Sequence, residues 1–319
     1  MQLSPSEGLS NIVKHYLIVE RGEDMKANYR LFPDGNPGIV FHFGDPLIQY
    51  TDDGSFPQNR SQAGHVMQPG TPQPRSFVYG QLSRYNDLLS GGRLGMLVVV
   101  LQPTGLYSLV KMAAHELNDD IIKLADLFGV EAIDLEEEVL GAGSALTGHS
   151  GPVTGSARAN HSGPVAGSEW NSRSASPADS ILTAIQSVER FLLKKQATAA
   201  NPDRLIMEAL DLMYESRGFV RMEELLKQIP VTERQLERKF KEYIGTSPKK
   251  MADTIKFQHF LKLLQNHPPG RKISDVIYDG GYYDQAHLNN YFKKMVGVTP
   301  LQYKANPYLL AVNFMQVPV

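Results

Sequence analysis

The sequence contains the stretch LERKFKEYIGTSP at 236–248, and a similar stretch, LNNYFKKMVGVTP, stands at 288–300. The two copies share a leucine, a phenylalanine and a lysine, then a glycine, and finally a Ser-Pro or Thr-Pro pair. Because leucine and phenylalanine four positions apart lie on one face of a helix, each copy predicts an amphipathic helix that ends at its glycine. A repeat of this kind indicates that one structural unit occurs twice.

Polar residues stand where the helices of each copy are expected to begin. A hydroxyl or carboxylate at this point can accept a hydrogen bond from an unpaired backbone N–H, and proline suits the first helical position that follows. A short apolar segment precedes each repeat helix, so the region 201–305 predicts a helix-turn-helix present twice. The four N-cap candidates are Thr232, Ser247, Asp284 and Thr299.

The chain of 319 residues is long enough for two domains, and its first 140 residues differ in kind from the last 119. Short runs of β-branched and aromatic residues, separated by Gly, Pro and Asp turns, predict a β-rich barrel or sandwich over 1–140, followed by helices. The fold class is therefore α+β multidomain, with an all-α tandem helix-turn-helix domain behind the β-rich one. The strands are expected at 13–19, 38–43, 76–82 and 96–101, and the first helices at 106–117, 119–128 and 132–140.

Residues 141–179 are dominated by Gly, Ser, Ala, Pro and Thr, and we interpret them as a flexible linker. An amphipathic connecting helix is expected within 180–200, and 306–319 is expected to form a C-terminal tail. The connecting helix has apolar residues at Ile181, Ile185, Val188 and Leu192. This spacing fits either a short coiled-coil seam in a homodimer or packing against a domain.

Composition narrows the classes of function. The absence of cysteine excludes disulfides, thiolate metal sites and thiol nucleophiles, and it fits a cytoplasmic protein. We expect no membrane span, no cofactor and no metal. The front 140 residues hold 10 Lys and Arg against 18 Asp and Glu, whereas 201–319 hold 17 against 13. This asymmetry indicates that only the back half meets a polyanion such as double-stranded DNA.

A helix-turn-helix reads DNA with the N-terminal part of its second helix in the major groove. The outward residues of the first repeat helix include Arg234, Glu237, Arg238 and Lys241, whereas those of the second include Gln285, His287 and Asn290. Arginine favours guanine, glutamine and asparagine favour adenine, and glutamate accepts from cytosine. The two copies thus carry different base-reading chemistry on one scaffold. Phosphate contacts are expected from Lys241, Lys249, Lys250, Lys272, Lys293 and Lys294.

Residues 219–304 resemble the DNA-binding domain of AraC/XylS-type transcriptional regulators. The resemblance rests on Leu236, Phe240 and Lys241 with the following Gly-x-Ser-Pro, and on GYYDQAHL at 281–288 with the following Gly-x-Thr-Pro. It implies two recognition helices joined by a linker helix, control through an N-terminal sensing or dimerising domain, and contact with RNA polymerase. The base readers that it implies are Arg234, Glu237, Arg238, Gln285, Ala286 and Asn290.

Some positions of this sequence depart from the family pattern, among them Leu226, Ile277 and Pro230. Asn290 stands where the family frequently has arginine, so we expect the first recognition helix to supply more of the affinity for DNA. The front half, with RLFPDG at 30–35 and RSFVYG at 75–80, resembles a poorly characterised sensor domain found ahead of such DNA-binding units. That resemblance implies no particular ligand.

Three alternatives remain open. The aromatic residues Phe41, Phe43, Tyr79 and Tyr107 either line a small-molecule effector site or belong to a core. His42 and His65 would serve a cupin-like metal-dependent enzyme domain, although no His-x-His pair accompanies them. An architectural protein without sequence preference is the third alternative, and it predicts similar binding to any duplex.

Overall fold

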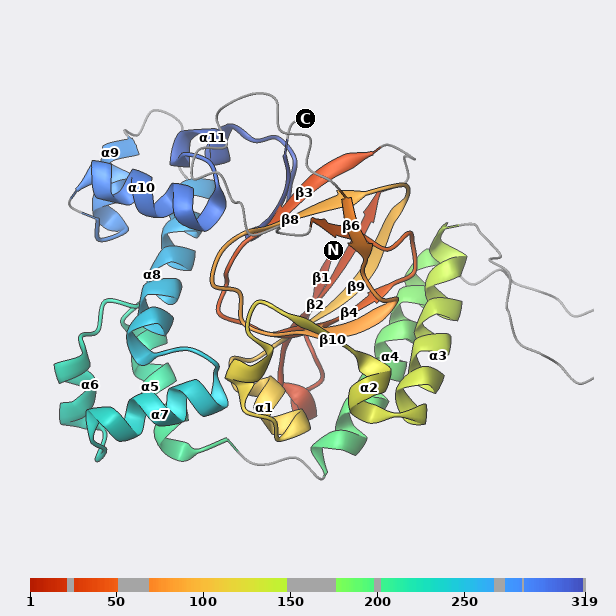
Figure 1. Ribbon diagram of the computed structural model, residues 1–319, viewed down its shortest axis with the longest axis horizontal. Coiled ribbons are helices and arrows are strands. Elements are labelled where there is room, and N and C mark those ends of the chain that lie inside the picture. The colour runs from red at the N-terminus through yellow and green to blue at the C-terminus, as the bar shows by residue number, and fades with distance from the viewer. Residues whose placement is uncertain are drawn as a thin grey trace, which may run out of the picture.

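The computed structural model describes residues 1–21, 26–50, 69–147, 176–197, 202–266, 273–282 and 284–317. Strands dominate the first part of the chain and helices the last part, as Figure 1 shows. Most of the predicted linker, 148–175, lies outside the described residues.

The first sheet has the order β1-β2-β9-β4-β7-β10, and all its neighbours are antiparallel. The four strands predicted from the sequence are β2, β4, β7 and β9. The central β9 is buried along its whole length because both faces of the sheet are covered. The strands of this sheet are β1 (Gln2–Leu3), β2 (Val13–Arg21), β9 (Leu94–Leu101), β4 (Gly38–His42), β7 (Ser76–Tyr79) and β10 (Ile121–Lys123).

The second sheet has the order β11-β12-β3-β8-β5-β6 and faces the first one. Val98 and Val100 of β9 pack between the sheets against side chains such as Tyr29 and Leu88. Among the described strands no ladder joins the two sheets, so the structure has two separate sheets and not a closed barrel. The strands here are β11 (Leu309–Ala311), β12 (Phe314–Val317), β3 (Ala27–Leu31), β8 (Asn86–Ser90), β5 (Ile48–Tyr50) and β6 (Pro69–Pro72).

Helices cover the outer face of the first sheet (Figure 1). Ile185, Val188 and Leu192 of α4 are buried in the core that the helices form with this sheet. The apolar seam therefore packs within the chain, as the second of the two interpretations above had it. The expected helix at 119–128 is instead β10 followed by α2. These elements are η1 (Glu7–Leu9), α1 (Gly105–Val110), η2 (Ala114–Leu117), α2 (Leu124–Phe128), α3 (Val130–Thr147) and α4 (Pro177–Gln196).

The rest of the chain forms two helix-turn-helix units joined by α8. Leu236 and Phe240 are buried in the first core, and Leu288 and Phe292 in the second. The N-terminal half of α8 packs in the first core and its C-terminal half in the second, so one helix serves both units. The helices are α5 (Arg204–Glu215), α6 (Met222–Gln228), α7 (Glu233–Tyr243), α8 (Pro248–Gln265), α9 (Ile273–Asp279), α10 (Gln285–Val296) and α11 (Pro300–Ala305).

The C-terminal segment differs from the expected tail at 306–319. β11 and β12 form a hairpin, and β12 pairs with β3 in antiparallel register, with Phe314 opposite Leu31. The chain thus returns from the second helix-turn-helix into the sheet of the N-terminal domain (Figure 1). Local sequence could not predict this pairing because the partner strand lies far away along the chain.

None of the described helices is both long and apolar enough to cross a bilayer.

Candidate nucleic-acid interface and effector cavity

The four polar residues at the helix starts all accept hydrogen bonds from the first turn of their helices. Thr232 accepts from the backbone N–H of Gln235, and Ser247 accepts from that of Lys250, both at 3.3 Å. Asp284 accepts from two backbone N–H groups of α10, at 2.8 and 3.1 Å. Thr299 opens α11 in the same way, at 3.3 Å from the N–H of Gln302. These caps fix where each recognition helix, α7 and α10, begins.

The predicted base readers lie on the solvent side of these two helices. Leucine and phenylalanine hold the opposite face in each core, so the outward residues are free to reach DNA. The outward residues of α7 include two guanidinium groups and a carboxylate. Those of α10 begin and end with an amide side chain. All seven are exposed: Arg234, Glu237 and Arg238 on α7, and Gln285, Ala286, His287 and Asn290 on α10.

Five of the six predicted phosphate-binding lysines are also exposed. They lie at the end of α7, at the start of α8 and near the end of α10, beside the reading faces. Lys272 lies outside the described residues. The five are Lys241, Lys249, Lys250, Lys293 and Lys294.

The C-terminal ends of both recognition helices are held by side chains of the N-terminal domain. Asn118 donates from Nδ2 to the carbonyl of Gly245, just after α7, at 2.6 Å. Arg30 donates from Nη1 to the carbonyl of Val296, the last residue of α10, at 3.1 Å. A cation at this end also complements the helix dipole. Both recognition helices therefore turn their C-terminal ends to the N-terminal domain and leave their reading ends exposed.

A lysine on α8 connects the two helix-turn-helix units. Lys256 donates from Nζ to the carbonyl of Gly281 at 2.8 Å. Its ammonium also lies 5.1 Å from the ring centre of Phe219 and 4.6 Å from that of Tyr282. Phe219 precedes α6, whereas Gly281 and Tyr282 precede α10. Lys256 thus contacts the loop ahead of α6 in the first unit and the loop ahead of α10 in the second, and burial lowers its pKa.

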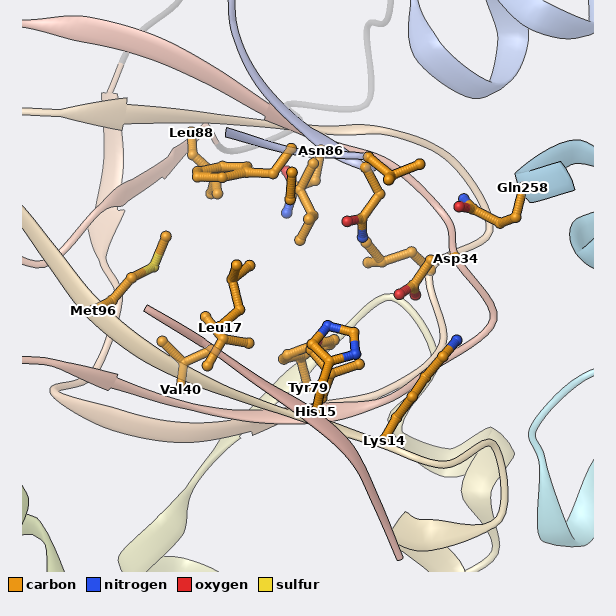
Figure 2. A pocket seen from close by; sticks show the side chains of 18 of the residues that line it. Lys14, His15, Leu17, Asp34, Val40, Tyr79, Asn86, Leu88, Met96 and Gln258 are labelled. Atoms are coloured by element: carbon orange, nitrogen blue, oxygen red, sulfur yellow. The ribbon is translucent and has the colours of Figure 1, made fainter. Parts of the chain in front are cut away.

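A cavity of about 380 Å³ lies between the two sheets. Figure 2 shows Leu17, Val40, Leu88 and Met96 around its apolar part. Lys14, His15 and Asp34 lie toward α8, from which Gln258 also faces the cavity (Figure 2). The volume falls within the usual range for small-molecule sites.

The polar end of the cavity holds three cationic side chains and three carboxylates, and they differ in how they are partnered. No hydrogen bond or ion pair to another described residue engages the ammonium groups of Lys14 and Lys262, or the guanidinium of Arg217, which all line it. Burial lowers the pKa of Lys14, and the Lys262 ammonium lowers it further against the opposite effect of Asp34. Burial, with the two lysines as further causes, lowers the pKa of His15 to about 4.

The carboxylates at this end are already engaged. Asp34 accepts from the backbone N–H of Asn36 at 3.0 Å, and burial raises its pKa. Asp119 accepts from the N–H and hydroxyl of Ser83, at 2.7 and 2.6 Å. Asp120 accepts from the N–H of Ile121 at 2.8 Å. An anion entering the cavity would therefore find cations without hydrogen-bond partners, whereas the three carboxylates already have theirs.

Of the four aromatic residues suggested for an effector site, only Tyr79 lines this cavity. Phe41 and Phe43 lie in the core beneath the helices, because alternate residues of a strand face opposite ways. Tyr107 packs against Tyr243 of the first helix-turn-helix, with ring centres 4.1 Å apart. The cationic residues of the cavity were missed because they come from strands and helices far apart in sequence.

His42, considered above as a metal ligand, is wholly buried. Its Nε2 lies 3.1 Å from Oε1 of Gln73, and its ring packs near Phe77. Burial lowers its pKa to about 4, so the ring is neutral at pH 7. Among the described residues, no group of three or more His, Asp or Glu side chains is arranged to hold a metal ion. His65 lies outside them.

Comparisons with known families place both halves of the chain. Residues 225–306 match the model of a helix-turn-helix domain, and residues 1–123 match a domain of unknown function, DUF6597. No curated protein matches the chain.

Solved structures of low similarity were also found. ToxT from Vibrio cholerae is 11% identical with a TM-score of 0.43, over 91% of this chain and 97% of that one. A ToxT structure with bound unsaturated fatty acid gives 11% and 0.44, over 91% and 94%. The C-terminal domain of AraT, a response regulator from Geobacillus stearothermophilus, is 22% identical with a TM-score of 0.30, over 33% and 87%.

The tandem helix-turn-helix fold, its exposed reading faces and the family match define a DNA-binding transcriptional regulator. Its DNA-binding domain is of the AraC type and follows an N-terminal DUF6597 domain.

Proposed function

We propose that this protein recognises a specific DNA sequence by placing α7 and α10 in two successive major grooves. The supporting observation is that both recognition helices expose their N-terminal reading ends while their C-terminal ends are held by one N-terminal domain. α8 has 18 residues, and a helix of this length spans about 27 Å. Successive major-groove faces are about 34 Å apart, so one rigid helix suffices to hold two reading helices on neighbouring turns.

In this proposal the two helices read different bases. Arg234 and Arg238 recognise guanine, and Glu237 accepts from cytosine. On α10, Gln285 and Asn290 favour adenine, His287 reaches a base edge, and Ala286 suits a thymine methyl group. The exposed lysines beside each helix contact phosphates, which position the protein without selecting a sequence.

Selection of oligonucleotides by the full chain tests this function. We expect an enriched site with two unlike halves whose centres lie about 10 base pairs apart. An architectural DNA-binding protein would enrich no sequence. Recovery of a single half-site alone would contradict the proposal of two reading helices.

We further propose that the N-terminal domain binds a small amphipathic anion in the cavity between its sheets. The apolar part of the cavity accepts an apolar body, and the unpaired Lys14 and Lys262 hold the anionic group. Burial is the main cause of the lowered pKa of Lys14, and the Lys262 ammonium adds to it, so an anion between the two lysines would stabilise their charged forms.

Fluorescence titration with anilinonaphthalene sulfonate and with its uncharged analogue N-phenylnaphthylamine tests the site. The sulfonate should bind more tightly, and Lys262→Met should weaken it about ten-fold while leaving the neutral probe unchanged. Lys249→Met is the matched control, since Lys249 lies on the exposed start of the same helix. Equal binding of both probes to both variants would exclude an anion site at this end.

Contact with RNA polymerase remains a proposal that rests on the function of such regulators. A homodimer is a second proposal, and it would need a surface other than the buried seam of α4. Sedimentation of the full chain, with and without DNA, measures the oligomeric state directly.

A further inference from the structure

The β3–β12 strand pair lies between the cavity and the second helix-turn-helix, beside α8, whose Gln258 and Lys262 line the cavity directly. β12 lies antiparallel to β3, with Phe314 opposite Leu31 and Met315 opposite Arg30. Successive side chains of a strand point to opposite faces of a sheet. The β3–β12 pair therefore has one face toward the cavity and the other toward the second helix-turn-helix.

The cavity face is apolar and tightly packed. Leu31 and Phe314 both line the cavity. The ring of Phe314 stacks on that of Tyr29, with centres 5.4 Å apart. An occupant of the cavity would touch these side chains directly.

The opposite face belongs to the second helix-turn-helix. Phe32, which follows β3, and Met315 are buried in its core with exposures of 0% and 1%. Between them Arg30 donates to the carbonyl of Val296 at the end of α10. Neighbouring residues of the same two strands thus contact the cavity on one side and the recognition helix unit on the other.

The hairpin is also fixed to the helix that precedes it. Tyr303 of α11 donates from its hydroxyl to the carbonyl of Val312 at 2.8 Å. Asn306 donates to the carbonyl of Gln316, also at 2.8 Å. Since α11 packs in the second core, the hairpin and the second helix-turn-helix are expected to move together.

We propose that the β3–β12 pair couples the cavity to the second recognition helix, so that an occupant of the cavity raises affinity for the second half-site. This inference rests on the effector site proposed above. The occupant contacts the hairpin only while the hairpin is paired with β3, so it stabilises the paired state. By linkage, DNA bound to a correctly held α10 raises affinity for the occupant by the same factor.

The coupling is specific to one half of the DNA site. The first helix-turn-helix contacts the N-terminal domain at η2 and α1, through Asn118 and Tyr107, and not through the β3–β12 pair. Its Tyr214, Arg217 and Ile255 line the cavity directly. The part of the coupling that runs through the β3–β12 pair should therefore act on the half-site read by α10 more than on the half-site read by α7.

An engineered disulfide tests the coupling without any ligand. Asn28 and Val317 are directly opposite on β3 and β12, and neither lines the cavity. Opposed residues of antiparallel strands have Cα separations that suit a disulfide. Because the natural chain has no cysteine, the double variant Asn28→Cys/Val317→Cys forms only this bond. The oxidised and reduced forms of one purified protein are then compared, with each single variant as control.

Three duplexes serve as DNA: the selected site, and the same site with either half scrambled. Oxidation should raise the affinity for DNA about five-fold or more where the α10 half is intact. The affinity for the duplex that keeps only the α7 half should not change. Anilinonaphthalene sulfonate should likewise raise the affinity of the wild-type chain for duplexes with an intact α10 half. Oxidation of the double variant should in turn raise its affinity for this probe.

The outcomes separate the two proposals. If the probe fails to bind but oxidation raises affinity for the α10 half-site, the effector site is wrong and the coupling stands. If the probe binds but neither it nor oxidation changes DNA affinity, the coupling is overturned and the site stands. A gain of equal size at both half-sites on oxidation of the disulfide also overturns it.

Discussion

Arg30 of the N-terminal domain donates a hydrogen bond to the carbonyl oxygen of Val296, the last residue of the second recognition helix, at 3.1 Å. The same guanidinium forms two bonds to Asp87, at 2.5 and 2.8 Å, and lies 4.2 Å from the ring centre of Tyr85. Its exposure is only 7%. A buried arginine thus connects the sheet of one domain to the end of α10, a proposed recognition helix, in the other.

Replacing Arg30 by Met should destabilise the protein by about 2–3 kcal/mol, because Asp87 and the carbonyl of Val296 lose charge-assisted hydrogen bonds in a largely buried place. Affinity for the half-site read by α10 should fall as well, since the helix end is no longer held. Urea unfolding and DNA titration measure the two effects. Arg221→Met is the matched control: Arg221 pairs with Glu224 on the exposed surface, and its loss should cost less than about 1 kcal/mol.

Arg238→Ala should cost about 1–3 kcal/mol on the selected site and little on random DNA, because a guanidinium that reads a base edge carries sequence information. Lys294→Ala should weaken binding to both DNAs alike and reduce the salt dependence, as expected for a phosphate contact. Titrations at several salt concentrations distinguish the two roles. A uniform loss for Arg238→Ala on every sequence would show that it does not read a base.

Asn290→Arg should tighten binding through the second recognition helix. Asn290 is exposed on α10 and carries an uncharged amide, so we expect the wild-type α10 half-site to contribute less than the α7 half-site. The variant should reduce this difference and shift the preferred base from adenine toward guanine. Repeating the oligonucleotide selection measures both changes. An unaltered preference at that position would place Asn290 away from the bases.

Lys256→Met should relax the required spacing between the two half-sites. The substitution removes the hydrogen bond to Gly281 and the cation contacts with Phe219 and Tyr282, while it keeps most of the side-chain volume. Each half-site alone should bind as before. Duplexes with one or two base pairs inserted between the halves should lose less affinity with the variant than with the wild type. Equal losses for both proteins would mean that other contacts set the spacing.

The free energy of unfolding should fall as the pH is lowered from about 6.5 toward 4. Burial lowers the pKa of His42 from 6.5 to about 4, so the unfolded chain binds a proton in this window that the folded protein does not. The loss from this residue is at most about 3 kcal/mol and levels off below pH 4. His15 contributes in the same direction, because burial lowers its pKa to about 4 as well.

Denaturant unfolding at pH 7 and pH 4.5 measures this dependence, and His42→Gln should make it shallower whatever the variant does to stability at pH 7. His287→Gln is the control, because His287 is exposed on α10. An unchanged slope in His42→Gln would assign the pH dependence to other groups.

The sequence by itself determined the helical half of this protein. Leu236 with Phe240, and Leu288 with Phe292, define their helices locally, and the caps and glycines define the ends. The same local rules predicted β2, β4, β7 and β9, whose apolar runs are long. They failed at β10, where three residues of strand precede a short helix.

Tertiary structure alone decided how the domains are joined. Nothing near Phe314 or Met315 in the sequence indicates a partner at Leu31 or Arg30, because strand pairing depends on chain segments brought together only by folding. The cavity has the same origin, since Lys14 and Lys262 come from opposite ends of the chain. The sequence thus determined the two helices that we propose read DNA, and only the packing of distant segments decided what holds those helices in place.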